Sequence, residues 1–249
     1  MIRQGKISFK GWLSFYGLLF VFSHCTISPD DTWVTVKTAN QEERLIVLPD
    51  SSTVWLNANS SLSYPQEWKE EVRDVKLSGE GYFTVQQSVQ PFRVLNGKLK
   101  AATYQGIFDV QAREHEEVCR VVTVTGQVLL STLAQSEEQL RLGPGLAGIF
   151  DQQTGKVYME PNRDPNVLAW RSKRLVFSQA NMRYVLNVLE NYFHIQIRLQ
   201  NPLLYNCTFS GTFHKPSLEE VLKVLALQFA HSAIYQDGST YLLAGEYCK

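Results

Sequence analysis

The stretch LIVLPDSSTVWL, residues 45–56, decides the class of fold. Ile46 and Leu48 lie at alternate positions before the turn PDSS, and Val54 and Leu56 do so after it. Successive side chains of a strand point to opposite faces, so this spacing is typical of strands with one buried face. Pro, Asp and Ser favour turns because they fix or cap the turning backbone. The stretch therefore predicts two antiparallel strands joined by a tight turn.

The same alternation continues to about residue 150. Pairs of apolar residues flank Gly79-Glu80-Gly81 and precede Thr125-Gly126 and Gly143-Pro144-Gly145. Another pair precedes Asn96-Gly97, which is the strongest hairpin signal in the chain. No amphipathic helix fits between these turn signals. We therefore expect a mainly β protein in which residues 30–150 form an all-β, sandwich-like domain.

The pattern changes after this domain. Residues 151–169 are polar and contain Pro161 and Pro165, so we assign them to a linker. Residues 170–249 are expected to form a small α+β module in which a strand–helix–strand unit occurs twice. Pro216-Ser217 followed by Glu220 matches a capping box, which marks the start of the second helix. One face of the first helix carries Met182, Val185, Leu186, Leu189, Tyr192 and Phe193.

The first 29 residues are expected to direct export. Three basic residues precede an apolar segment at residues 11–22, and the first acidic residue is Asp30. This order is typical of a bacterial export signal. Three interpretations place the rest of the chain in the periplasm: a cleaved signal peptide, a lipoprotein signal with lipidation at Cys25, and a short uncleaved membrane anchor. A buried N-terminal helix is the remaining alternative.

The sequence offers no catalytic residue and no cofactor or metal site. Lys+Arg and Asp+Glu both number 24, so the chain has no overall positive charge to attract nucleic acid. The five histidines and four cysteines lack the spacing of metal ligands. Gly79-Glu80-Gly81 lacks the lysine and the helix of a phosphate-binding loop, so we take it for a turn or bulge. These features favour a protein-binding role over an enzyme.

Several motifs resemble those of FecR-family proteins, in the family's order. They are LPDSSTVWLNANS at residues 48–60, Arg73-x-Val75-x-Leu77-x-Gly79-Glu80-Gly81-Tyr82-Phe83-x-Val85, Pro91-Phe92-x-Val94, and Leu142-x-Pro144-Gly145. A second set resembles the module that follows the FecR domain in many Bacteroidetes members, and it comprises Leu175-x-Phe177, Glu190-x-Tyr192 and the stretch from Phe213 through Ser217-Leu218-Glu219-Glu220-Val221-Leu222. That module is similar to the secretin/TonB short N-terminal domain.

The resemblance implies a role in cell-surface signalling. Family members lie in the inner membrane, sense the signalling domain of a TonB-dependent outer-membrane receptor in the periplasm, and hold an extracytoplasmic-function sigma factor through a cytoplasmic N-terminal domain. Ten residues precede the apolar segment here, too few for that sigma-binding domain, so we expect any effect on a sigma factor to be indirect. The alternatives are an envelope lipoprotein or a binding or structural protein that has lost the signalling circuit, and an enzyme such as a glycan hydrolase.

We expect the C-terminal module to bind its partner through an exposed strand edge, because a sheet of few strands must leave edges unpaired. The segment favoured for this role is rich in β-formers and short of charge; it comprises Thr208, Phe209, Ser210, Gly211, Thr212 and Phe213. A central strand packed under the second helix is the alternative. Cys207 and Cys248 each lie on or beside a strand of the module, so they are the favoured disulfide pair, although sequence does not determine connectivity.

Overall fold

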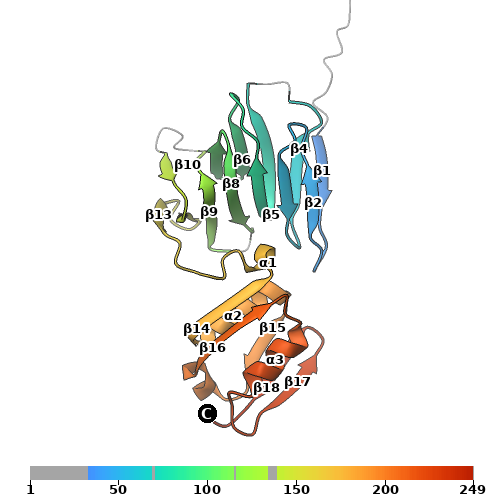
Figure 1. The fold of residues 1–249 in the computed structure, drawn as a ribbon, viewed down its shortest axis with the longest axis vertical. Coiled ribbons are helices and arrows are strands. Elements are labelled where there is room, and N and C mark those ends of the chain that lie inside the picture. Colours follow the sequence, from blue (N-terminus) through green and yellow to red (C-terminus); the bar gives the residue numbers. More distant parts are fainter. Residues whose placement is uncertain (1–32, 69–70, 115, 134–138, 249) are drawn as a thin grey trace, which may run out of the picture. The chain divides into compact units, whose positions relative to one another are not determined.

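The structure is a computed structural model, and it describes residues 33–68, 71–114, 116–133 and 139–248 (Figure 1). The expected export segment and Cys25 lie outside the described residues. Strands account for 51% of the structure and helices for 14%, so the fold is mainly β, as the alternating sequence predicts. Within the described residues, no helix is both long enough and apolar enough to cross a membrane.

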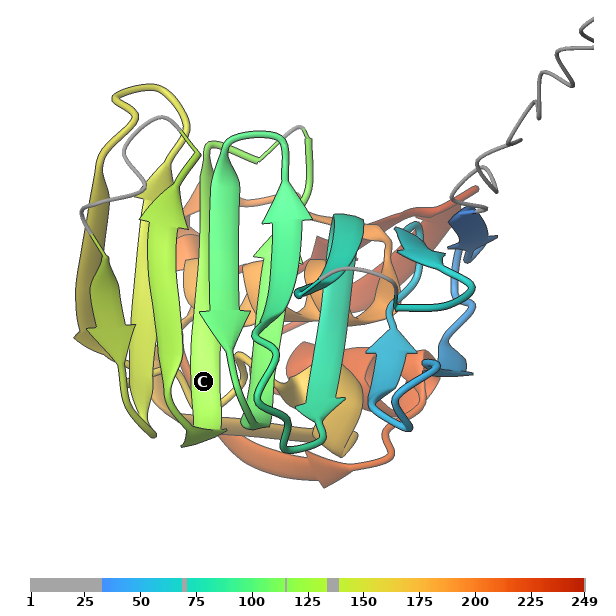
Figure 2. The ribbon, with the colours of Figure 1, turned by 90° about the horizontal axis from the view of Figure 1, so that it is seen from above.

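The β-rich part comprises the strands up to residue 161. They are β1 (Trp33–Lys37), β2 (Arg44–Val47), β3 (Thr53–Leu56), β4 (Ser61–Pro65), β5 (Arg73–Val85), β6 (Phe92–Asn96), β7 (Leu99–Thr103), β8 (Gly106–Ala112), β9 (Val118–Gly126), β10 (Val128–Thr132), β11 (Leu140–Leu142), β12 (Leu146–Asp151) and β13 (Val157–Pro161). The hydrogen-bonded order is β11-β10-β7-β6-β5-β8-β9-β12-β13, with β3 and β4 also paired to β5. Figure 2 shows the green strands of this part running side by side.

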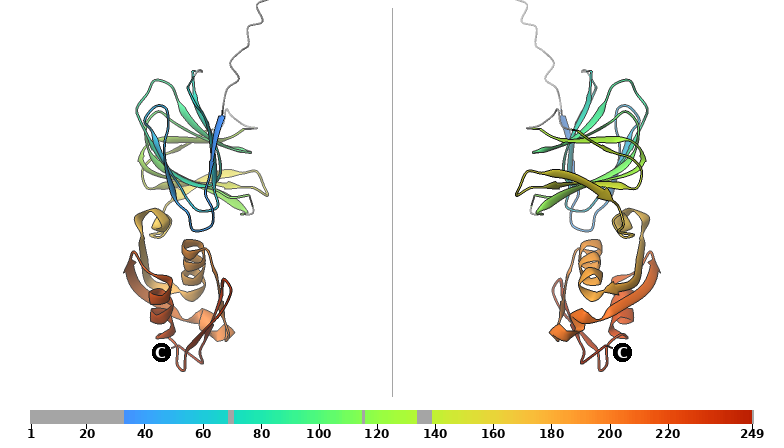
Figure 3. Two further views of the ribbon diagram at one scale, coloured as in Figure 1. Left: turned by 90° about the vertical axis from the view of Figure 1, so that its right-hand side faces the viewer. Right: turned by 90° about the vertical axis from the view of Figure 1, so that its left-hand side faces the viewer.

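Strand β5 joins the two layers of the sandwich. Its first half pairs with β4 and β6, and its second half pairs with β3 and β8. The two layers are visible edge-on in Figure 3. Gly79 lies where the strand passes between layers; its φ of +104° disfavours other residues, and a Cβ there would lie 2.3 Å from Ser60 Oγ. Gly79-Glu80-Gly81 is thus a bend within one long strand.

The core of the sandwich forms from the inward positions of both layers. Phe83 and Phe108 stack with their ring centroids 5.2 Å apart, and both side chains are fully buried. Asn96 and Leu99 close the hairpin between β6 and β7, so the hairpin expected at Asn96-Gly97 is confirmed. The motif residues that alternate in the sequence therefore line this core.

The segment expected to be a linker contains a strand. Residues 157–161 form β13, which pairs along its length with β12. Four of its five residues are exposed, and it lies at the end of the sheet. A solvated edge strand needs few apolar residues and tolerates Pro161 at its end, so its sequence resembles that of a linker. Residues 157–161 thus belong to the sandwich, and the linker assignment over 151–169 was too broad.

The C-terminal module follows the predicted order of elements. It comprises α1 (Ala169–Ser172), β14 (Arg174–Asn181), α2 (Met182–Phe193), β15 (Gln196–Leu199), a 3₁₀ helix η1 (Pro202–Asn206), β16 (Thr208–His214), α3 (Leu218–Ala226), β17 (Ala233–Asp237) and β18 (Thr240–Ala244). Two sheets result: β14-β16, and β15-β18-β17. Helix α2 contacts strands of both sheets, and the buried faces of both helices enter one core.

The ends of the helices agree with the sequence in part. The Glu220 amide N–H donates to the Ser217 hydroxyl over 3.2 Å, so the predicted start of α3 is confirmed. Helix α2 begins after Asn181, whose side-chain oxygen accepts from the Arg183 amide. This cap was not predicted. It places the end of β14 directly against the start of α2.

Candidate protein-interaction surface

One edge of the two-stranded sheet is covered by a side chain. The Asn166 amide N–H donates to the carbonyl oxygen of Val176 in β14 over 2.8 Å, and the Val176 N–H donates back to the Asn166 side-chain oxygen over 2.7 Å. Asn166 is 6% exposed. Its amide group thus makes the pair of bonds that a neighbouring strand would make. Strand addition at this point of β14 is blocked.

The opposite edge, on β16, is not covered in this way by any residue that the structure describes. Thr212 lies opposite Val176 in the antiparallel register. Residues directly opposite one another turn their backbone groups the same way, either toward or away from the partner strand. Because those of Val176 point outward to Asn166, those of Thr212 point away from β14. No other strand pairs with β16 within the described part of the chain.

The side chains of β16 divide cleanly between its two faces. Phe209 and Phe213 are buried, and their rings stack 6.2 Å apart. Thr208, Ser210 and Thr212 are exposed. The buried rings anchor the strand in the module core, so the backbone edge is held firmly in place. Of the two alternatives drawn from the sequence, the structure matches the edge strand and not the central one.

A hydrogen-bonded cluster positions the covering asparagine. The Tyr184 hydroxyl donates to Asp164, and the Asn166 amide N–H donates to the Tyr184 oxygen over 3.0 Å. Burial, together with the bond to Asp164, raises the pKa of Tyr184 to about 12. The tyrosine therefore keeps its proton at physiological pH and remains a donor. Asn166 is fixed by this contact from α2 as well as by β14.

The second sheet repeats the contrast between a covered and an open edge. The Glu190 carboxylate accepts the Ile197 amide N–H of β15 over 2.7 Å, on the side away from β18. Strand β17 forms the other edge and bears Ile234 and Tyr235, which are 37% and 58% exposed. The sequence analysis did not single out β17. The turn Asp237-Gly238 joins β17 to β18, but hydrophobic residues alone do not show that a strand is exposed on both faces.

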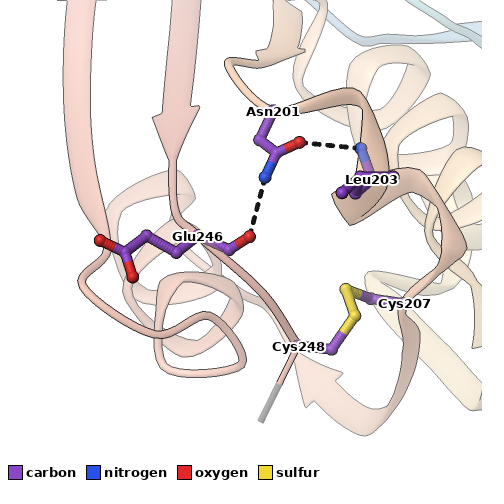
Figure 4. The surroundings of a disulfide bond; sticks show 5 residues. All are labelled: Asn201, Leu203, Cys207, Glu246 and Cys248. Atoms are coloured by element: carbon purple, nitrogen blue, oxygen red, sulfur yellow. Dashed lines mark hydrogen bonds between the residues drawn. A yellow bond between two sulfur atoms is a disulfide. The ribbon is translucent and has the colours of Figure 1, made fainter.

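The C-terminal end of the module is tied down covalently (Figure 4). Cys207, just before β16, forms a disulfide with Cys248 across a sequence separation of 41, which is the pair favoured by the sequence. Asn201 adds two bonds: its amide N–H donates to the Glu246 carbonyl over 2.8 Å, and its oxygen accepts the Leu203 amide N–H over 3.0 Å. The start of β16 is therefore anchored from two sides.

Two buried carboxyl groups of the sandwich, Glu80 and Asp109, lie close enough to affect each other's ionisation. Glu80 accepts from Asn57 over 2.7 Å and from Arg113 over 2.6 Å. Burial raises the pKa of Glu80. The pKa of Asp109 is raised well above its usual range, mainly by burial and secondly by the nearby Glu80 charge. Both carboxyl groups are at most 5% exposed. In the described ranges, no three His, Cys, Asp or Glu residues are grouped as metal ligands would be.

The fold and this surface define a class of protein: a β sandwich joined to a small α+β module with open strand edges. The family model described as "FecR protein" matches residues 34–129, and the one described as "FecR, C-terminal" matches residues 174–241. The chain belongs to the FecR family.

Two solved structures share the fold. Both are crystal structures of a candidate anti-sigma factor from Parabacteroides distasonis ATCC 8503, at 2.50 and 1.65 Å resolution. Each has a TM-score of 0.68 and 24% sequence identity, and each alignment covers 86% of this chain. The alignments cover 100% and 99% of those chains. No curated protein matches this sequence.

Proposed function

We propose that this chain is a periplasmic signal-transduction protein of the FecR type. It relays the state of a TonB-dependent outer-membrane receptor toward an extracytoplasmic-function sigma factor. Family membership supports the signalling role. The basic and apolar N-terminal segment supports export, with the chain tethered to the membrane or released from it.

We further propose that the receptor's signalling domain adds a strand to the open edge of β16. This proposal rests on a difference between the two edges of one sheet. On β14, the Asn166 side chain bonds to the N–H and C=O of Val176, whereas on β16 the backbone groups of Thr212 point outward. Proteins usually protect exposed strand edges, so an anchored and uncovered edge is a natural site for strand addition.

Proline at Thr212 tests this mode of binding. The outward-facing amide of Thr212 is not needed by β14, so T212P removes a donor that only the partner would use. We expect T212P to abolish binding to the receptor signalling domain encoded in the same genome, measured by isothermal titration calorimetry. T212K, which discourages strand pairing without altering the backbone, should weaken binding as well.

The matched control is I234P on the open edge of β17, which should leave binding at the wild-type level. Circular dichroism spectra should show that all three variants keep the wild-type fold. Wild-type affinity in folded T212P and T212K would contradict docking at β16. Loss of binding in I234P alone would move the site to β17.

A further inference from the structure

The outer face of the sandwich contains a groove of about 630 Å³ that is separate from the docking edge. Strands β6, β7, β10 and β11 supply its floor. Register places Arg93 opposite Ala102, Ala102 opposite Leu129, and Leu129 opposite Arg141. One row of side chains thus crosses four strands, with an arginine at each end and apolar residues between. The small side chain of Ala102 leaves the middle of the row hollow.

The charge of the groove differs from that of the chain as a whole. Its charged lining residues are Arg93, Lys100 and Arg141, and none of the described residues that line it is acidic. Asp74, beside the groove, pairs with Arg93 through two bonds of 2.5 Å. Since the whole chain has a formal net charge of zero, this concentration of positive charge is local.

Two of the three basic side chains, Lys100 and Arg141, can donate further hydrogen bonds. Arg141 donates from one nitrogen to the Gln127 side-chain oxygen over 2.9 Å, and a guanidinium has five N–H donors in all. The Lys100 ammonium group has no ion pair or hydrogen bond with any described residue, although the Lys100 backbone pairs within the sheet. The groove therefore presents unsatisfied donors for an anion, and a carboxylate suits them in charge and geometry.

The rim adds groups that suit a sugar. Tyr104 is 53% exposed at one end, and the amide side chains of Gln105 and Gln127 lie beside it. An aromatic ring and an apolar floor can pack against the C–H face of a sugar ring, while amides bond to hydroxyl groups. Four strands at the usual spacing place the two end arginines about 14 Å apart, the length of a short oligosaccharide.

We propose that this groove binds an acidic oligosaccharide. Its carboxylates pair with Lys100 and Arg141, and its rings lie over Ala102 and Leu129. A peptide is less well served, because β6, β7 and β10 each pair with a strand on both sides, and only the outer edge of β11, at the end of the sheet, is unpaired. The site is independent of the receptor docking proposed above, since it lies on a different domain.

Isothermal titration calorimetry on the full chain tests the proposal, with trigalacturonate as the acidic probe. We expect trigalacturonate to bind, neutral maltotriose to bind at least tenfold more weakly, and added salt to weaken the acidic probe. K100Q and R141Q should each reduce affinity at least tenfold. K98Q is the matched control, because Lys98 is exposed in the turn between β6 and β7 and does not line the groove. It should bind like the wild type.

Three outcomes would overturn the proposal: no binding of trigalacturonate, equal binding of maltotriose, or unchanged affinity in a folded K100Q/R141Q double variant. Tighter binding of a hexaglutamate peptide than of trigalacturonate would also overturn it and reassign the groove to an acidic peptide. The variant T212P should bind trigalacturonate normally, so failure of receptor docking and failure of this site give different results.

Discussion

In the sandwich, the guanidinium of Arg73 is buried and donates to the Asp50 carboxylate over 2.5 Å and to three backbone carbonyls. In the C-terminal module, a disulfide from Cys207 holds the chain end instead. A sandwich is large enough to enclose an ion pair and satisfy it, whereas a small module gains more from a covalent link. The disulfide beside β16 holds this strand in position although its outer edge is unpaired.

Removal of Arg73 should have the largest effect. R73A leaves the Asp50 carboxylate and the carbonyl oxygens of Gln86, Gln90 and Tyr104 without their donor. We expect a loss of about 3–5 kcal/mol in the free energy of unfolding, measured by urea denaturation.

The matched control for this change is R93A. Arg93 pairs with Asp74 near the surface, with 31% and 21% of the two side chains exposed, so the loss should be about 1 kcal/mol or less. Equal losses in R73A and R93A would show that burial of the ion pair is not what stabilises the sandwich.

Loss of the disulfide should come next. The C207S/C248S variant frees a loop of about 40 residues in the unfolded chain, which corresponds to about 2–4 kcal/mol. Chemical denaturation should show this loss in the module. Reductant should destabilise the wild type and leave the variant unchanged. The remaining described cysteine, Cys119, is buried, and burial raises its thiol pKa to about 11, so it should not react at neutral pH. A reductant effect in the variant would contradict this assignment.

Removal of the covering side chain should have the smallest effect on stability. N166A deletes the two bonds to Val176 and the one to Tyr184, for an expected loss of about 1–3 kcal/mol. Hydrogen exchange at the Val176 amide should become faster, because that donor is no longer held.

The exposed Asn187 provides the control for N166A, and N187A should change stability by about 0.5 kcal/mol or less. Unchanged exchange at Val176 in N166A would mean that Asn166 does not protect this edge. The result would then remove the contrast between the edges of β14 and β16.

Much of the fold could be predicted because burial imposes local periods. The alternation at Ile46, Leu48, Val54 and Leu56 predicts the two strands observed as β2 and β3 and their turn. The helical spacing from Met182 likewise predicts α2, whose buried residues are Met182, Val185, Leu186 and Leu189. In each case, apolar residues two, three or four positions apart face the same core. Their spacing along the chain is therefore enough to predict the element.

The candidate site could be predicted only in part. Residues 208–213 are recognisable as a strand, but the residues that distinguish a central strand from an edge lie elsewhere in the chain. Asn166 and Glu190 cover β14 and β15, and neither position shows from the sequence which backbone amide it will meet. The groove on the sandwich likewise depends on the register of β6, β7, β10 and β11.

The sequence by itself determined the family, the buried faces of the helices, and the type and order of most elements, although not β13. The tertiary structure alone decided that β5 passes between two layers, that Asn166 completes one sheet edge, and that β16 leaves another open. The physical reason is the range of the interactions. Side-chain burial repeats over two to four residues and is legible in the chain, whereas strand neighbours are chosen by hydrogen bonds between segments that are distant in sequence.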